Sequence, residues 1–419
     1  MDSPNVAFLL TAASLVLLMT PGLALFYGGM GRSKSVLNMM MMSFSAIGVV
    51  GVLWVLVGFS VSAGDTVGGW FGNPGSDFGM ASIFQSGTEA TELDGSEFDL
   101  ILAAFGATFA IITVALISGA VADRMKFSAW LIFAGLWAVL VYSPVSHWVW
   151  GGGFLSSEEG MLFETMTAPQ DIAGGTVVHI NAGVAALVLA LLLGTRKGFG
   201  KEPFKPHNLP FVMMGAALLW FGWFGFNAGS WWEADVFAAQ IWLNTLVAPA
   251  AAMLAWLLVE RIRDGKATSL GAASGIVAGL VAITPAGLSV SPLGAIAIGI
   301  LAGIASALAV GLKYKFGYDD SLDVVGVHLV AGLVGTLAVG LFATDVNAFG
   351  DAGLFYGGGA SLLASQAIAA VAVMIYCAVV TLVIGLALKY TIGLRAPEEV
   401  EVEGIDYAEH GETAYEEAV

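Results

Sequence analysis

The sequence predicts an all-α polytopic membrane protein, and three observations carry that prediction. Of the 419 residues, 58% are hydrophobic and only 11% are charged, and the mean hydropathy is +0.86. A soluble domain carries about 25% charged residues. Several apolar runs reach the roughly 20 residues that a helix needs to cross a bilayer. The basic residues also fall in alternate loops, as they do between membrane-spanning helices.

Charged and Gly/Pro-rich breaks divide the chain into eleven predicted transmembrane helices. Their boundaries follow from where each apolar run ends. The predicted spans are 6–30, 36–62, 98–121, 127–149, 169–195, 209–231, 236–260, 268–287, 292–313, 321–343 and 361–390.

The lysines and arginines orient these helices. All 15 follow an odd-numbered span, and a missed or invented helix would break that alternation. Because basic loops stay in the cytoplasm, the N-terminus is predicted outside and the C-terminus inside the plasma membrane. The basic residues are Arg32, Lys34, Arg124, Lys126, Arg196, Lys197, Lys201, Lys205, Arg261, Arg263, Lys266, Lys313, Lys315, Lys389 and Arg395.

The acidic residues account for the net charge of −17 and do not indicate a nucleic-acid partner. They gather in the C-terminal tail and in predicted outer loops, where no basic residue falls. An outer face with acidic and no basic residues would concentrate cations at a pore mouth. The alternative is that this face is simply a solvated, halotolerant surface. The single Cys377 excludes an intrachain disulfide. The outer-loop acids include Glu89, Glu92, Asp94, Glu97, Glu158 and Glu159.

Two histidine segments indicate an internal repeat. His179 and His328 each have apolar neighbours, an Ala-Gly pair at the same offset and an aspartate eight residues earlier, Asp171 and Asp320. Each closes a set of five predicted helices. Since five is odd, two copies must lie in opposite orientations, which is an inverted five-plus-five repeat. We expect repeats at about 6–195 and 209–343, a peripheral helix at about 361–390, and together a transport domain over 1–390 followed by a cytoplasmic tail over 391–419.

The histidines predict a functional site, because ionisable side chains within a membrane are costly. A neutral pair could share one proton through an N–H···N bond and titrate as a coupled unit. The alternatives are two buried polar groups satisfied by neighbouring helices, or a pair of haem ligands. Asp171 is expected to cap the fifth helix rather than to touch a substrate.

Aromatic residues meet at the outer ends of three predicted helices. Phe105 and Phe109 share one helix face, Phe226 and Ser230 share another, and Trp150 ends the fourth span. Ring faces attract a small cation with roughly 0.5 to 2 kcal/mol each. The alternative is an interfacial aromatic belt. Small residues over 271–279 and 299–307 are assigned to close helix packing. No enzyme activity, metal or cofactor is predicted.

At these residues the sequence resembles the ammonium transporter family, Amt/Mep/Rh, and in particular its bacterial and archaeal Amt branch. The resemblance covers nearly the whole chain and implies eleven transmembrane helices, an inverted repeat and a homotrimer with one pore per subunit. The matching stretches are PGLALFYGGM (21–30), ATFAIITVALISGAVADRMKFSA (107–129), DIAGGTVVHINAG (171–183), FGKEPFKPHNLP (199–210), WFGFNAGS (223–230), DVVGVHLVAG (323–332) and GLRAPEEVEVEGIDYAEHGETAY (393–415).

The resemblance also implies residue roles. Trp150, Phe109 and Ser230 would form an external ammonium site. Phe109 and Phe226 would close the pore beneath it. His179 and His328 would line the apolar conduction path, and Asp171 would support recruitment from the outer side. The residues of all these motif positions are present in this sequence.

The implied function is ammonium transport. Ammonium, or its analogue methylammonium, would be recruited outside, deprotonated and conducted as ammonia, with or without a separately relayed proton. Composition alone favours a disordered tail over 391–419, whereas the resemblance predicts that the tail packs under the trimer and helps a cytosolic PII signal protein to block the pore. The alternative function is an ammonium sensor that signals through this tail and a PII partner.

Overall fold

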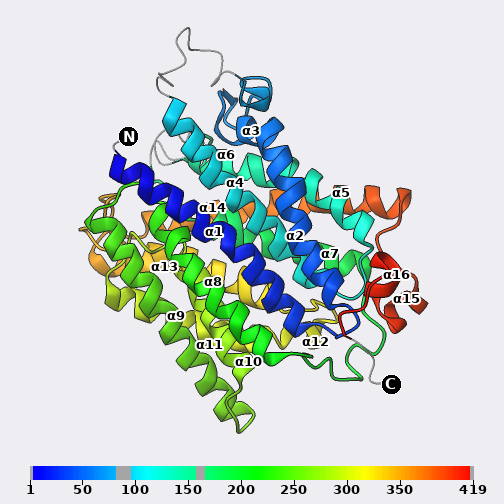
Figure 1. Cartoon of the computed structure of the whole chain (residues 1–419). Helices are drawn as coiled ribbons and strands as arrows, with labels where there is room; N and C mark the ends of the chain where they lie inside the picture. Colours follow the sequence, from blue (N-terminus) through cyan, green and yellow to red (C-terminus); the bar gives the residue numbers. More distant parts are fainter. Residues whose placement is uncertain (1–2, 82–95, 157–165, 416–419) are drawn as a thin grey trace.

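Helices form nearly all the regular structure in the computed structural model, which describes residues 3–81, 96–156 and 166–415. The acidic residues Glu89, Glu92, Asp94, Glu158 and Glu159 and the side chain of Glu97 lie outside this description. Ten helices within it are long and apolar enough to cross a membrane. They pack side by side as one bundle (Figure 1).

The first four predicted spans match the structure closely, and the second and fourth are interrupted by a wider, π-helical turn. A short hairpin lies between the second and third spans, and it is the only sheet in the described residues. The elements are α1 (Ser3–Met30), α2 (Val36–Leu53), η1 (Trp54–Gly58), α3 (Phe59–Ala63), β1 (Thr66–Val67), β2 (Phe71–Gly72), η2 (Phe78–Met80), α4 (Ser96–Val121), α5 (Phe127–Trp137), η4 (Ala138–Tyr142), α6 (Ser143–Trp150), η6 (Gly175–Ile180) and α7 (Asn181–Leu193).

The second half continues the bundle and ends in two short helices of the tail. The predicted span 268–287 corresponds to a 15-residue helix, α10, which is shorter than a full membrane crossing. The elements are α8 (Leu209–Gly229), α9 (Val236–Arg263), α10 (Ser269–Ile283), α11 (Pro292–Ala309), α12 (Leu312–Phe316), η7 (Val325–Leu329), α13 (Val330–Phe342), η8 (Leu354–Tyr356), α14 (Ser361–Thr391), α15 (Glu398–Glu403) and α16 (Ile405–His410).

The fifth predicted span begins later than expected. We expected a helix from residue 169, but the backbone is non-helical up to Gly174, which has a φ of +110°. The helix starts at Gly175 because the Asp171 carboxylate accepts the first free backbone N–H groups there. A non-helical backbone is tolerated in a membrane protein where it is buried in protein, and Gln170, Asp171 and Ala173 are all buried.

Polar caps fix the starts of four helices in the second half. The Asn208 side chain accepts the N–H of Phe211 at the start of α8, and Asp235 accepts from Phe237 and Ala238 at the start of α9. Thr268 and Ser291 cap α10 and α11 in the same way. These side chains satisfy backbone donors that the first helical turn leaves without partners.

Small residues bring helices into close contact, as predicted for 271–279 and 299–307. A Cβ added at Gly279 would lie 2.5 Å from Pro249 Cα on α9. A Cβ at Gly299 or Gly303 of α11 would also collide with the backbone of α9. Backbones in lipid approach this closely only where side chains are small.

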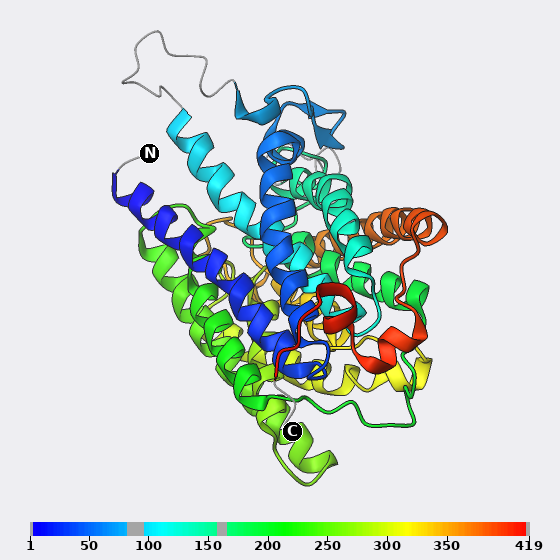
Figure 2. The same cartoon turned by 45° about the vertical axis from the view of Figure 1, so that its right-hand side comes forward.

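The C-terminal tail is folded against the rest of the chain (Figure 2). Asp406 accepts the N–H groups of Leu37 and Asn38 at 3.0 and 2.8 Å and thereby caps α2. The Glu401 carboxylate pairs with Arg395 at 2.6 Å and accepts the N–H of Lys197. The described part of the tail is therefore ordered, contrary to what its composition alone favours.

Candidate functional site

Five rings form a continuous file through the bundle, in the order Trp150, Phe109, Phe226, His179 and His328. Trp150 meets Phe109 edge-on, with ring centroids 6.1 Å apart. Phe109 and Phe226 stack at 4.0 Å with planes 16° apart. Phe226 lies 6.2 Å from His179, and His179 lies 5.4 Å from His328. The sequence placed these residues on separate spans, and the fold brings them together.

The two histidines contact each other directly. Their Nδ1 atoms are 3.3 Å apart, which is within hydrogen-bond range, and the side chains are almost fully buried. A haem iron between two histidines would need its porphyrin plane between these nitrogens, and the short separation leaves no room for one. His179 Nε2 has no hydrogen-bond partner in the part of the chain that the structure describes.

Each histidine sits in a π-helical turn. His179 lies in η6 and His328 in η7, and both turns continue directly into an α-helix. A π-turn accommodates one more residue than an α-helical turn and is common at functional sites. The matched turns place the two imidazoles face to face although they come from distant parts of the sequence.

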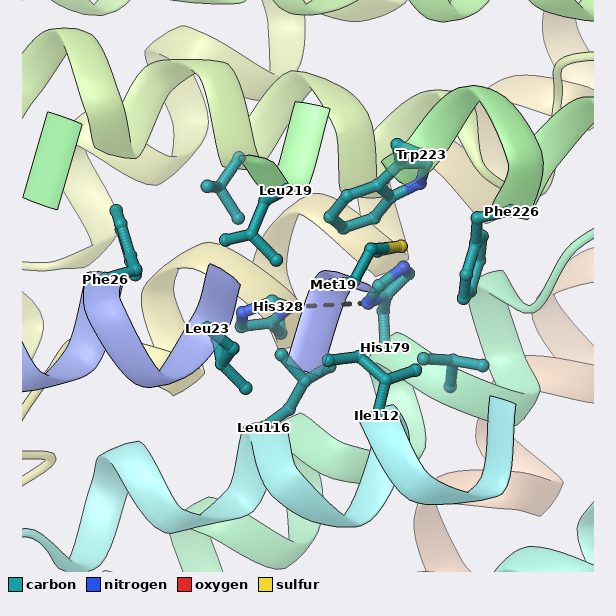
Figure 3. Close-up of a pocket in the computed structure, with 12 residues that line it drawn as sticks. Met19, Leu23, Phe26, Ile112, Leu116, His179, Leu219, Trp223, Phe226 and His328 are labelled. Carbon is teal, nitrogen blue, oxygen red and sulfur yellow. Dashed lines mark hydrogen bonds between the residues drawn. The ribbon is translucent and has the colours of Figure 1, made fainter. Parts of the chain in front are cut away.

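A pocket runs along the histidines (Figure 3). Every other side chain that lines it is apolar or aromatic, so the imidazoles are its only titratable groups. The lining residues are Met19, Leu23, Phe26, Ile112, Leu116, Val178, His179, Leu219, Trp223, Phe226, Val277 and His328.

Two aspartates cap the histidine-bearing segments in the same manner. Asp171 accepts the N–H groups of Gly174, Gly175 and Thr176 at 2.7 to 2.8 Å, together with the Thr176 hydroxyl. Asp320 accepts from Val324 and Val325 at 3.1 and 2.7 Å. Carboxylates are favourable at helix N-termini, where unpaired N–H groups point outward. Asp171 thus caps its helix, as the sequence predicts, and does not contact His179.

At the Trp150 end of the file, the side-chain hydrogens of Trp150 and Ser230 are engaged. Trp150 Nε1 donates to the backbone oxygen of Asp171 at 2.8 Å. The Ser230 hydroxyl donates to the backbone oxygen of Phe226 at 2.9 Å. Ser230 keeps its lone pairs, and the rings keep their faces. What these two side chains leave for a ligand is therefore the Ser230 lone pairs and the faces of the rings.

Sequence reasoning missed Trp223. Its indole stacks on His179 at 5.4 Å and 20°, and its Nε1 donates to Thr284 Oγ1 at 2.9 Å. Figure 3 shows Trp223 and Phe226 on the same helix, beside His179. The signal was present, because Trp223 precedes Phe226 by three residues and residues at that spacing share a helix face.

A buried ionic cluster lies at the opposite, loop-rich end of the bundle. Arg196 pairs with Asp319 at 2.8 Å and with Asp123 at 3.0 Å, and Arg124 donates to the backbone oxygen of Asp319 at 2.5 Å. Burial alone would raise the pKa of Asp319, but its hydrogen bonds and ion pair with Arg196 outweigh burial and hold that pKa below its ordinary value. Burial lowers the pKa of Arg124 to about 10.

The fold and the site define a class: membrane-embedded helices around an apolar, ring-lined pocket make a transport protein rather than an enzyme. The comparisons name the family. The model of the Ammonium Transporter Family matches residues 7–415, and the chain belongs to that family. Relatives named ammonium transporters occur in both bacteria and archaea.

The similarity extends over the whole chain. An ammonium transporter of Mycobacterium tuberculosis is 57% identical over 100% of this chain and 91% of its own. The crystal structure of Saccharomyces cerevisiae Mep2 superposes with a TM-score of 0.85 at 31% identity, covering 100% of this chain and 92% of that one. A structure titled Sensor Amt Protein has a TM-score of 0.85 at 27% identity, covering 97% and 98%.

Proposed function

We propose that this protein recruits ammonium at the outer end of the ring file, deprotonates it and conducts ammonia past the two histidines. The observation that carries the proposal is the acceptor-only outer end, where Trp150 and Ser230 have already donated their hydrogens to backbone oxygens. Ammonium offers four N–H donors and a positive charge. It therefore matches both the free lone pairs of Ser230 and the faces of the aromatic rings.

The stacked pair of Phe109 and Phe226 is the proposed gate and the place of deprotonation. With their ring centroids 4.0 Å apart, the two rings fill the path between Trp150 and His179. A bare ion loses its hydration there at a cost of many kcal/mol, whereas ammonia is small and neutral. The ion therefore gives up its proton at the rings, either to water on the outer side or to the histidine relay, and the neutral molecule passes.

His179 and His328 are proposed to line the conduction path below the gate. The unpartnered Nε2 of His179 can accept an N–H from the passing molecule. The shared Nδ1 contact can carry one proton between the imidazoles. This arrangement supports a proton relay beside the ammonia, in which case transport is electrogenic.

The proposal includes the membrane arrangement. We assign α10 as a further crossing, which gives eleven helices, with the N-terminus outside and the tail in the cytoplasm of a plasma-membrane protein. The equivalent capping aspartates and π-turns at His179 and His328 support the inverted repeat. The transport domain then covers 1–390 and the tail 391–419, and three copies assemble with one pore each.

Ammonium-evoked current in proteoliposomes tests the mechanism. The parent is compared with His179→Ala and His328→Ala, and each variant is first shown to fold and assemble. We expect both variants to lose most of the current, because each removes one end of the shared proton contact. An undiminished and equally selective current in both variants would exclude the relay.

Methylammonium uptake by vesicles separates a transporter from the alternative, a sensor that binds ammonium and signals through its tail. We expect uptake that saturates and that competes with ammonium. The absence of uptake at any imposed gradient, with ammonium binding retained, would favour the sensor.

The tail is proposed to help a cytosolic PII signal protein to dock. Its described part already lies on the same face as the basic loops, through Glu401 and Asp406. Deletion of residues 393–419 is expected to weaken PII capture in a pull-down with ADP. Equal capture by the truncated and full-length proteins would contradict a role for the tail.

A further inference from the structure

The segment that leads into Asp171 is held by α14, the helix outside the two proposed repeats. Thr167 accepts from Ser365 Oγ through its backbone oxygen at 2.5 Å, and its N–H donates to Ser361 Oγ at 3.0 Å. The Gln366 side chain accepts the N–H of Gln170 at 2.9 Å and donates to the Gln170 oxygen at 2.8 Å. The two amide contacts have the reciprocal pattern of neighbouring strands.

Gln366 is therefore bonded to the residue immediately before Asp171. The Asp171 backbone oxygen holds the indole of Trp150, and its carboxylate caps the segment that carries His179. Gln366 also donates to the backbone oxygen of Thr336 on α13, at 3.0 Å. One side chain thus ties α14 and α13 to the strand-like segment that positions the outer site.

The burial of these groups makes the contact specific. Gln366 and Gln170 are each 1% exposed, so no bulk water can replace a lost hydrogen bond. On its other side, Gln170 Oε1 accepts from Ser289 Oγ at 2.7 Å. A buried amide that loses its partner leaves a donor and an acceptor unsatisfied, which favours displacement of the segment.

We propose that Gln366 is a positioning residue for ammonium recruitment, acting through Asp171 on Trp150. The proposal rests on the proposed function. It gives α14 a part in substrate binding without any contact between that helix and the substrate. Loss of the Gln366 amide lets the Asp171 oxygen move away from the indole, so that recruitment weakens while the histidine path below is unchanged.

Half-saturation of the ammonium-evoked current tests this proposal. Gln366→Met keeps the side-chain length and removes the amide. We expect the half-saturating ammonium concentration to rise about fivefold, because the substitution removes all three hydrogen bonds of the buried amide. The maximal current is expected to stay within about twofold of the parent. Thr381→Val is the matched control on the same helix, because it removes the bond from Trp137 Nε1 at 3.0 Å and does not touch the segment.

A double-mutant cycle with Trp150→Leu gives the decisive result. If Gln366 acts through Trp150, Gln366→Met adds no further rise in the Trp150→Leu background. Additive effects, a parent-like Gln366→Met, or an equal rise in Thr381→Val would overturn the positioning role. A parent-like Trp150→Leu would instead overturn the proposed recruitment site itself, and the positioning role with it. If Gln366→Met fails to assemble, Ser365→Ala replaces it, because that variant removes a hydrogen bond to Thr167 in the same segment. Ser365→Ala is expected to raise the half-saturating ammonium concentration by a smaller factor. A parent-like value would contradict the proposal.

Discussion

The hydrogen-bond partners of Trp150 and Ser230 decide which groups these two side chains can offer to a ligand. The indole of Trp150 and the hydroxyl of Ser230 are both potential donors, and each is bonded to a backbone oxygen. These side chains therefore present acceptors to a ligand, and the preference that we propose for a donor-rich cation would follow from these two hydrogen bonds. The bond of Trp150 to Asp171 is not visible in the spacing of residues along the chain, whereas that of Ser230 follows from its four-residue spacing to Phe226.

The stacked phenylalanines give a prediction at this scale. Phe226→Leu removes one of the two stacked rings that we propose as the gate. We expect the selectivity for ammonium over potassium to fall about tenfold, which equals the roughly 1.4 kcal/mol that one desolvated cation–ring contact contributes. Reversal potentials in ammonium and potassium gradients measure the change. Phe199→Leu is the control, since it breaks a ring stack with Tyr314 far from the file, and selectivity retained in Phe226→Leu would contradict the gate.

The sequence identified most of the file residue by residue. His179 and His328 could be found because titratable groups are rare in apolar helices, and Phe109, Phe226 and Trp150 because of their helical spacing and resemblance to a family. Trp223 was missed because its three-residue spacing from Phe226 is one of several such spacings in an aromatic-rich span, so the spacing alone does not distinguish it from its neighbours. Its contact with His179 depends on the rotation of α8, which packing against α1 and α10 sets.

At the scale of elements, the two capped segments are equivalent in construction. Asp171 receives three backbone N–H groups and Asp320 receives two. Sequence spacing showed the shared distance of eight residues to each histidine. It could not show that Asp171 lies in a non-helical stretch, because the start of a helix at Gly175 depends on that cap and on burial by α14.

Substitution of the two aspartates, one at a time, distinguishes the role of Asp171 in recruitment from the capping role that both residues share. Asp171→Asn leaves one acceptor oxygen for its several donors, and we expect a loss of about 2 kcal/mol in unfolding free energy together with a higher half-saturating ammonium concentration. Asp320→Asn is expected to lower stability without changing half-saturation from the outside. Thermal unfolding in detergent and current titration measure both. Identical effects of the two substitutions on half-saturation would argue against a role for Asp171 in recruitment.

The whole molecule is joined at its loop-rich end by the cluster of Arg196, Asp319 and Asp123. This cluster links the loops after α4, α7 and α12. The sequence does not indicate which of these loops contact one another, because each alone is a short charged stretch. The positive-inside pattern predicted where these residues lie relative to the membrane. It did not predict that Arg196 and Asp319 would be buried as an ion pair rather than solvated.

The cluster predicts a pH dependence of stability. Because Arg196 lowers the pKa of Asp319, the carboxylate stabilises the fold above the unfolded-state pKa of about 3.9. This contribution is lost as the pH falls through the lower, folded-state value. Asp319→Asn should therefore cost about 3 kcal/mol at neutral pH, by leaving Arg196 buried without its partner, and the difference from the parent should shrink in acid.

Melting of the purified protein in detergent across pH measures this difference. Asp264→Asn is the control, since Asp264 pairs with Arg263 in an exposed bridge and its loss should leave the melting temperature unchanged. A gap between Asp319→Asn and the parent that stays constant into acid would contradict the assignment.

The π-helical turns at His179 and His328 have a consequence for engineering. Each turn holds a one-residue surplus that a regular α-helix would not contain, and deletion of one residue in η6 would restore the regular winding. The helix beyond the turn would keep its place, but the residues inside the turn, His179 among them, would change direction, so that one imidazole turns away from the other. A sequence optimised for thermostability alone would tend to remove these irregular turns. A stabilised version of this protein should therefore keep both turns unaltered and take its gains from the loops and the lipid-facing surface.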